Sequence, residues 1–221
     1  RDDVESRGLG DVYKRQYLDY VYFARLLEAD KQYEEAVVQF NKALSMDKSH
    51  TEIYKDISDV YEKKRDFPKA IEAYKNYLDE MKSSPDISDL FLYGRLNYYA
   101  ATDSAYQDKQ PTYLAEADTI FAQVAVKVPD NYLGNFWRAR VNSLRDPETT
   151  QGLAKPYYEA ALSILEQKPD ATKSVLVECN SYLGYYYFVK EDYNQSKQYW
   201  NKILEIDPEN ETATKALGGI K

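Results

Sequence analysis

The first part of the chain repeats itself every 34 residues, and this repeat limits the possible folds more than any other feature. A shift of 34 places aligns similar residues: Tyr20 with Tyr54, Ala24 with Ser58, Leu27 with Tyr61, Ala36 with Ala70 and Phe40 with Tyr74. A short period of this kind is typical of arrays in which each unit contacts only its neighbours. Apolar and aromatic residues at helical spacing predict a buried stripe in each unit, as in Ala70-Ile71-Tyr74-Tyr77-Leu78. We expect the small residues of a unit to let two antiparallel helices approach closely.

The last unit carries the fullest set of these residues, in the order Leu183-Gly184, Tyr187, Ser196, Trp200 and Pro208. Trp200 takes the aromatic position of the second helix, and Ser196 stands where a small alanine is usual. This pattern resembles the tetratricopeptide repeat, and the resemblance covers about residues 17–210. It implies an all-α fold, a right-handed superhelical solenoid of antiparallel helix pairs, and it looks like the bacterial type.

The repeats differ in length along the chain. We place five units at about residues 17–50, 51–84, 87–131, 132–176 and 177–210, with a short capping helix at 211–221. The small residues Gly94, Ala139 and Gly184 lie 45 places apart, so the third and fourth units are longer than the first. We expect the additional residues of the third unit in a longer first helix and in a loop around Thr102–Thr112. In the fourth unit we expect an irregular segment at residues 146–152.

Residues 1–16 do not fit the repeat. The run from Ser6 to Gln16 resembles the translation of a transposon-type sequencing adapter. We therefore expect residues 1–16 to be a disordered leader of artefactual origin and exclude them from the fold. A natural polar leader is the alternative. On this interpretation the native chain begins before Tyr17, and further repeats precede it.

Composition excludes several functions. The net charge is −8 and the pI about 4.9, which disfavours nucleic acid as a partner. The sequence contains no run of 18 apolar residues, so it does not predict a membrane span. The lone His50 and Cys179 lie far apart in sequence, and no phosphate-binding, metalloprotease or nucleophile-elbow motif is present. We therefore expect neither catalysis nor a cofactor or metal, and expect Cys179 to be a buried structural thiol.

The resemblance implies that first helices line an inner groove, with the residue after each small one pointing into it. The predicted groove residues are Arg25, Phe91, Arg95, Tyr98, Phe136, Arg140, Tyr185 and Phe188. Arginine beside aromatic residues is typical of interface hot spots. The spacing Phe-x3-Arg occurs twice, at Phe91–Arg95 and Phe136–Arg140, and we expect this pair to anchor an acidic segment. The alternatives stay open: the aromatic side chains pack between helices, and each arginine pairs with an acidic residue of the chain itself.

These observations predict a non-enzymatic scaffold that binds a peptide or protein in its groove. The alternatives are the C-terminal interaction domain of a larger catalytic or signalling protein, and glycan binding by aromatic rings. Some relatives bind chaperone tails through lysines and asparagines, which this chain lacks. Val21 and Arg25 stand where lysine and asparagine would be needed, and Ser88 and Leu92 replace basic residues in the third unit. The tyrosine-rich repeats look like those of exported bacterial proteins, so we favour a periplasmic location. The partner's identity and the oligomeric state have no signature in the sequence.

Overall fold

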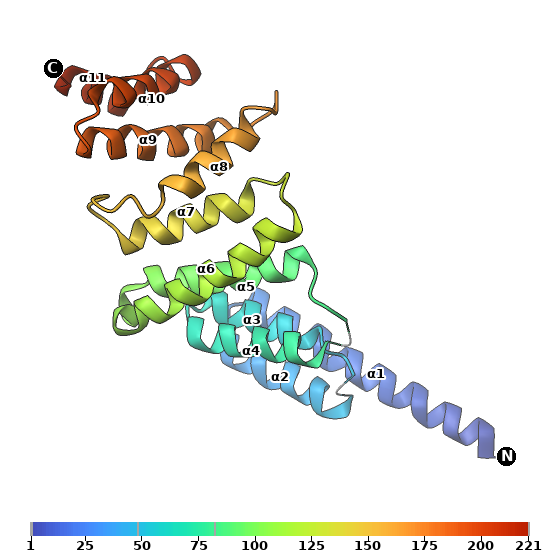
Figure 1. Cartoon of the computed structure of the whole chain (residues 1–221). Coiled ribbons are helices and arrows are strands. Elements are labelled where there is room, and N and C mark those ends of the chain that lie inside the picture. Colours follow the sequence, from blue (N-terminus) through green and yellow to red (C-terminus); the bar gives the residue numbers. More distant parts are fainter. Residues whose placement is uncertain (1, 48, 82, 221) are drawn as a thin grey trace. The chain divides into compact units, whose positions relative to one another are not determined.

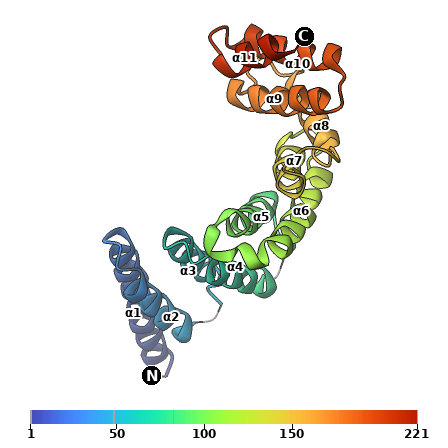
Figure 2. The same ribbon diagram turned by 90° about the vertical axis from the view of Figure 1, so that its left-hand side faces the viewer.

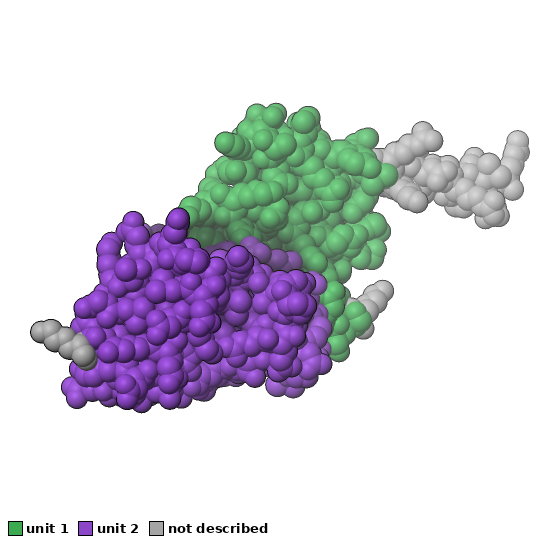
Figure 3. Space-filling view, turned by 90° about the horizontal axis from the view of Figure 1, so that it is seen from above, with its two compact units in different colours: residues 1–86 green, residues 87–221 purple. Residues whose placement is uncertain are grey.

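Helices account for the regular structure of the chain. The computed structural model describes residues 2–47, 49–81 and 83–220, with side chains from residue 16 onward. No strand occurs in these ranges, so the prediction of an all-α fold is confirmed. The chain divides into two compact units, residues 1–86 and 87–221 (Figure 3), and each is described by itself.

Unit 1 contains two helix pairs, α1 (Asp2–Ala29) with α2 (Tyr33–Met46), and α3 (Ile53–Lys63) with α4 (Phe67–Glu80). The small residues predicted to face each other are fully enclosed, since Ala24, Ala36 and Ala70 are each 0% exposed. Phe40 is also 0% exposed and belongs to the apolar core of this unit. The 34-residue repeat therefore corresponds to one helix pair.

Unit 2 continues the same arrangement. Its first helices are α5 (Ile87–Thr102), α7 (Leu133–Arg145) and α9 (Lys173–Val189), and their partners are α6 (Gln110–Lys127), α8 (Lys155–Leu165) and α10 (Tyr193–Ile206). The final helix, α11 (Glu211–Gly219), packs on α10 as the predicted cap, with Ala213 fully buried. Figures 1 and 2 show these helices stacked in chain order from α5 to α11. None of the described helices is long and apolar enough to cross a membrane.

A serine hydroxyl joins the two helices of a pair at the place where small residues meet. Ser58 on α3 donates to the carbonyl oxygen of Ala70 on α4 at 2.8 Å. In the last pair the direction is reversed, because Ser196 on α10 donates to the carbonyl oxygen of Gly184 on α9 at 2.7 Å. Serine therefore replaces alanine without leaving a buried hydroxyl unsatisfied. At Gly184 a Cβ atom would lie 2.8 Å from the Trp200 ring, which explains the glycine there.

The turn inside a helix pair has a recurring backbone. Lys31, Arg65 and Glu191 each lie two residues after the end of a first helix and have φ between 62° and 63°, a left-handed conformation that favours glycine. The next helix then starts on a capping carboxylate in two of these pairs. Asp66 accepts from the backbone N–H of Lys69, and Asp192 accepts from that of Gln195.

The long units differ partly from prediction. After α5 the chain forms a 3-10 helix at Ser104–Lys109, and α6 begins at Gln110 with Pro111 in its first turn. The predicted loop at Thr102–Thr112 is therefore wrong, since proline costs no hydrogen bond in a first turn. The irregular segment after α7 is confirmed and is ordered by Asp146, whose carboxylate accepts backbone N–H groups of residues 151–153.

Helix α1 extends into the N-terminal residues that do not fit the repeat. Its bounds include most of residues 1–16, where we predicted a disordered leader, but the side chains of residues 1–15 lie outside the described part. The origin of this segment stays a prediction. From residue 16 onward, α1 exposes the apolar side chains of Leu18, Tyr22, Phe23 and Leu26.

Candidate functional site

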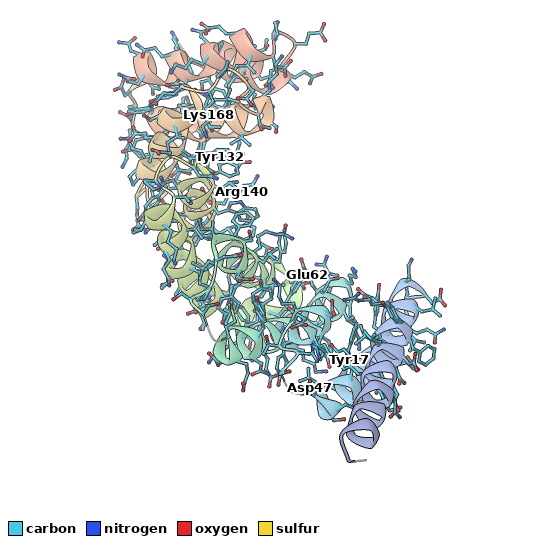
Figure 4. All side chains as sticks on the ribbon, turned by 90° about the vertical axis from the view of Figure 1, so that its right-hand side faces the viewer. Tyr17, Asp47, Glu62, Tyr132, Arg140 and Lys168 are labelled. Atoms are coloured by element: carbon cyan, nitrogen blue, oxygen red, sulfur yellow. The ribbon has the colours of Figure 1, made fainter. Side chains whose placement is uncertain are left out.

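Arg140 on α7 is held by an acidic residue of the next first helix. Its Nε and Nη2 atoms donate to the two carboxylate oxygens of Glu178 on α9 at 2.7 and 2.6 Å. The guanidinium also lies 4.4 Å from the centre of the Phe136 ring. Hydrogen bonding to Glu178 raises the pKa of Arg140. The structure therefore contains the internal ion pair that was one of the two interpretations of Arg140. Arg140 is labelled in Figure 4.

Phe136 does not contribute to a surface. Its side chain is only 3% exposed and packs against Tyr158 with ring centres 6.2 Å apart. The prediction that Phe136 and Arg140 together form an exposed anchor is wrong, because the phenylalanine belongs to the core and the arginine is already paired. The spacing of one helical turn placed both on one side of α7 but could not show that α8 covers the ring.

The equivalent residues of α5 surround Trp137. Phe91 and Tyr98 both meet the indole of Trp137 edge to face, at 5.7 and 5.2 Å between ring centres. The guanidinium of Arg95 lies over the Tyr99 ring at 5.3 Å. Burial raises the pKa of the Tyr98 hydroxyl. Because these side chains are half-buried and pack on Trp137, they stabilise the contact of α5 with α7.

The first helices nevertheless share one face. The charges of Arg140 on α7 and Glu178 on α9 both influence the pKa of the Tyr98 hydroxyl on α5. Tyr158 supports the pair from α8, since its hydroxyl donates to Glu178 at 3.1 Å. We call the surface carrying Tyr98, Arg140, Glu178 and Tyr185 the first-helix face of unit 2.

The open part of this face lies at its C-terminal end. Tyr185 and Phe188 on α9 are 43% and 42% exposed. They border a cavity of about 230 Å³ whose floor includes Trp200 of α10 and whose far side is α11. The lining of this cavity therefore keeps large apolar side chains in contact with water.

Arg25 lies in unit 1 and belongs to a different surface. Its Nη2 atom is 3.1 Å from a carboxylate oxygen of Asp56, and its side chain is 55% exposed. Nearby, the Lys63 ammonium bridges Glu28 and Asp59, and hydrogen bonds to both carboxylates raise its pKa. Paired charges dominate this surface.

The glycan alternative requires exposed rings that lie in one plane. The exposed pair Phe188 and Tyr193 meets at 53° between ring planes. Tyr187 and Tyr199 are nearly parallel, at 7°, but both are half-buried. The described rings therefore do not form a flat exposed ledge on α9 and α10.

Residues able to perform chemistry are dispersed. Burial raises the pKa of Cys179 to about 12, with a further contribution from the charge of Glu178, so the thiol stays protonated at neutral pH. His50 stacks on Tyr17, with ring centres 4.2 Å apart, in the other unit. No group of histidine, cysteine and acidic side chains suited to a metal ion occurs in the described part of the chain.

Sequence reasoning missed Glu178, Trp200 and Lys215. Glu178 lies six residues before Gly184, and residues seven apart share a helix face. Including that position among the groove positions would have placed Glu178 on the same face as Tyr185. Trp200 and Lys215 reach the pocket from α10 and α11, and no local spacing connects them with α9.

Comparison with known proteins agrees with this architecture. The tetratricopeptide repeat profile matches residues 20–50 and 182–210. The chain is similar to the C-terminal part of a tetratricopeptide-repeat-containing protein from Cytophaga hutchinsonii, with 30% identity and a TM-score of 0.78 over 91% of this chain and 73% of that one. No curated protein matches the sequence.

More distant structures share the fold. YrrB, described as a tetratricopeptide repeat protein with an unusual peptide-binding site, has 19% identity and a TM-score of 0.60 over 92% of each chain. MamA from Desulfovibrio magneticus RS-1 has 11% identity and a TM-score of 0.62 over 89% of this chain and 97% of that one.

Proposed function

Because this chain belongs to the tetratricopeptide repeat family, we propose that it is a non-enzymatic scaffold that binds a protein or peptide partner on the first-helix face of unit 2. The observation that carries the proposal is the exposure of Tyr185 and Phe188 beside an apolar cavity. Aromatic side chains dominate the binding energy of many interfaces. Exposed rings beside a cavity gain most from burial by a partner.

The rest of the face supports this role by being rigid. The pair of Arg140 with Glu178 and the rings around Trp137 hold α5, α7 and α9 at fixed positions. A partner then binds without having to order the surface first, which lowers the entropy cost of association. The peptide-binding site named for YrrB is consistent with a peptide as ligand.

Selection from a random peptide display library on the immobilised chain tests the proposal. Dissociation constants of the enriched peptides are then measured by fluorescence anisotropy. We expect Phe188→Ala and Tyr185→Ala each to weaken binding about tenfold or more, the effect of losing an interface anchor. Val126→Ala is the control, because Val126 on α6 is also exposed, at 80%, but does not line the cavity. The proposal fails if no peptide is enriched, or if the three variants bind alike.

A further inference from the structure

The pocket at the C-terminal end of unit 2 is built from three helices. Tyr185 and Phe188 come from α9, Trp200 from α10, and Lys215, Gly219 and the following Ile220 from the region of α11. Trp200 and Ile220 are each only 6% exposed, so they form the floor and one wall. The cap is firmly seated, because Ala213 and Ile220 pack with Trp200 and Ile203 in one apolar cluster. The pocket is therefore a fixed hollow between packed helices.

Helix α11 ends in Gly219, which contributes no side chain to the lining of the pocket. A Cβ atom built on Gly219 would meet no atom within 4 Å. Gly219 lines the pocket, so the space that a side chain there would occupy is empty in the structure. Gly218 has equally open surroundings but does not line the pocket.

The volume limits what enters. The cavity measures about 230 Å³, whereas sites for drug-sized ligands span roughly 300–1,000 Å³. This space suits one large side chain of a peptide, with the peptide backbone lying outside. The lining rings favour an aromatic or branched aliphatic side chain, because apolar surface is then removed from water on both partners.

The charge of Lys215 at the rim of the pocket favours a particular type of peptide residue next to the buried side chain. Lys215 is the one charged side chain among the described residues that line the pocket, in a chain whose net charge is −8. Its ammonium contacts Glu211 at 3.0 Å, but both side chains are strongly exposed, at 77% and 82%. Exposed ion pairs one helical turn apart contribute little to the free energy of folding. The Lys215 ammonium can therefore exchange Glu211 for a carboxylate of the ligand when binding excludes water.

We infer that this pocket receives one large apolar side chain of a peptide, and that Lys215 binds a carboxylate on the adjacent residue. The inference rests on the proposed function and specifies its ligand as a short acidic and apolar segment. Phe188 and Tyr185 enclose the side chain, Trp200 forms the floor, and Lys215 provides the preference for an acid.

Nuclear magnetic resonance tests this directly, because the chain has two tryptophans. Trp200 lines the pocket, while Trp137 belongs to the core cluster of α5 to α9, so their indole N–H signals give a probe and an internal reference. The 15N-labelled full chain is titrated with acetylated, amidated hexapeptides of glycine and serine that contain a central Phe-Asp, Ala-Asp or Phe-Asn. We expect the Phe-Asp peptide to shift the Trp200 signal and leave Trp137 in place. Compared with the Phe-Asp peptide, the Ala-Asp peptide, which lacks the ring, should bind at least tenfold more weakly. The Phe-Asn peptide, which lacks the charge, should bind about threefold more weakly.

Three variants decide the assignment. Gly219→Leu adds a large side chain to the pocket lining and should abolish the Trp200 shift, whereas the matched Gly218→Leu should preserve it. Both replace a helical glycine and should not lower the melting temperature, so loss of binding in the first is not loss of folding. Lys215→Gln should remove the preference for Phe-Asp over Phe-Asn.

The outcomes are distinct from those of the proposed function. An unmoved Trp200 signal with shifts around Tyr98 or Arg140 overturns the pocket assignment and leaves the scaffold function standing. Equal binding of the Ala-Asp peptide, or an acid preference that survives in Lys215→Gln, also overturns the inference. If none of the peptides shifts any signal of unit 2, the pocket assignment fails, and the peptides enriched by display decide the function separately.

Discussion

Arg140 and Glu178 join α7 to α9 through a forked ion pair with hydrogen bonds of 2.7 and 2.6 Å. Their side chains are 31% and 33% exposed, so the pair lies between a surface pair and a buried one. Glu178 also accepts from the Tyr158 hydroxyl. Because a planar guanidinium matches both carboxylate oxygens, this contact fixes the relative rotation of the two helices.

A double-mutant cycle of Arg140→Ala and Glu178→Ala should therefore show coupling. We expect a coupling energy of about 1–2 kcal/mol in the free energy of unfolding. This exceeds the value for exposed pairs because the ion pair is bidentate and partly shielded from water. Urea denaturation of the four proteins measures it. The pair Lys215–Glu211, which is almost fully exposed, is the control and should couple by less than about 0.5 kcal/mol. Equal coupling in both cycles would contradict a structural role for Arg140.

The interior of the helix pairs was predictable from sequence, because it depends on local spacing. Ala36 and Ala70 lie 34 residues apart, and both are 0% exposed. Exposure of the outer faces was not predictable in this way. Phe23 and Leu26 precede Ile57 and Val60 by the same 34 residues, yet the first two are 48% and 58% exposed and the last two 6% and 0%. A repeat fixes which positions face a neighbour but not whether a neighbour covers them.

Ala70 tests the register of the helix pair. Ala70→Phe should lower the free energy of unfolding by about 1–3 kcal/mol, since a ring must be fitted where no space exists. Ala70 is fully buried and its carbonyl oxygen accepts from Ser58. Ala115→Phe on α6 is the matched control, because Ala115 is exposed. It should lower the free energy of unfolding only by the difference in helix propensity between alanine and phenylalanine. Chemical denaturation compares the two, and similar costs would place Ala70 outside the interface.

The left-handed turn residues offer a route to higher stability. Lys31→Gly and Glu191→Gly should each raise the free energy of unfolding by about 0.5–1 kcal/mol. Both residues have φ of 62°, where a side chain costs about 1 kcal/mol and glycine does not. Thermal unfolding measures the gain. The same substitution at the exposed helical position Glu35 should instead destabilise by about 1 kcal/mol. A loss at all three positions would mean that the turns are not strained.

The candidate site was only partly predictable. Tyr185 and Phe188 were identified from their positions after Gly184, because residues of one helix keep their relative directions in any packing. The burial of Phe136 depends on Tyr158 of α8, and the pairing of Arg140 depends on Glu178, 38 residues further along. Contacts between separate helices are set by crossing angles, which the repeat spacing does not contain.

The thiol of Cys179 should be unreactive in the folded chain. Its side chain is fully buried, and its pKa is raised to about 12, so little thiolate forms at pH 8 and reagents have no access. Ellman's reagent should report almost no thiol in native buffer and one per chain in concentrated urea, since the chain has a single cysteine. Rapid reaction of the native protein would place Cys179 at the surface.

The same thiol should make the fold sensitive to alkali. Its pKa rises from an ordinary 9.0 to about 12 in the folded state, so between these values the unfolded chain loses a proton that the folded chain keeps. Stability from this group is therefore complete below about pH 9 and falls as pH rises toward 12. From pH 8 to pH 10.5 the loss should be about 2 kcal/mol. Buried tyrosines add losses of the same sign, because burial raises the pKa values of Tyr98, Tyr158 and Tyr199.

Cys179→Ala isolates the contribution of the thiol. The variant starts less stable because of its cavity, but its urea midpoint should fall less between the two pH values. An identical fall in both proteins would show that the thiol ionises equally in the folded and unfolded states.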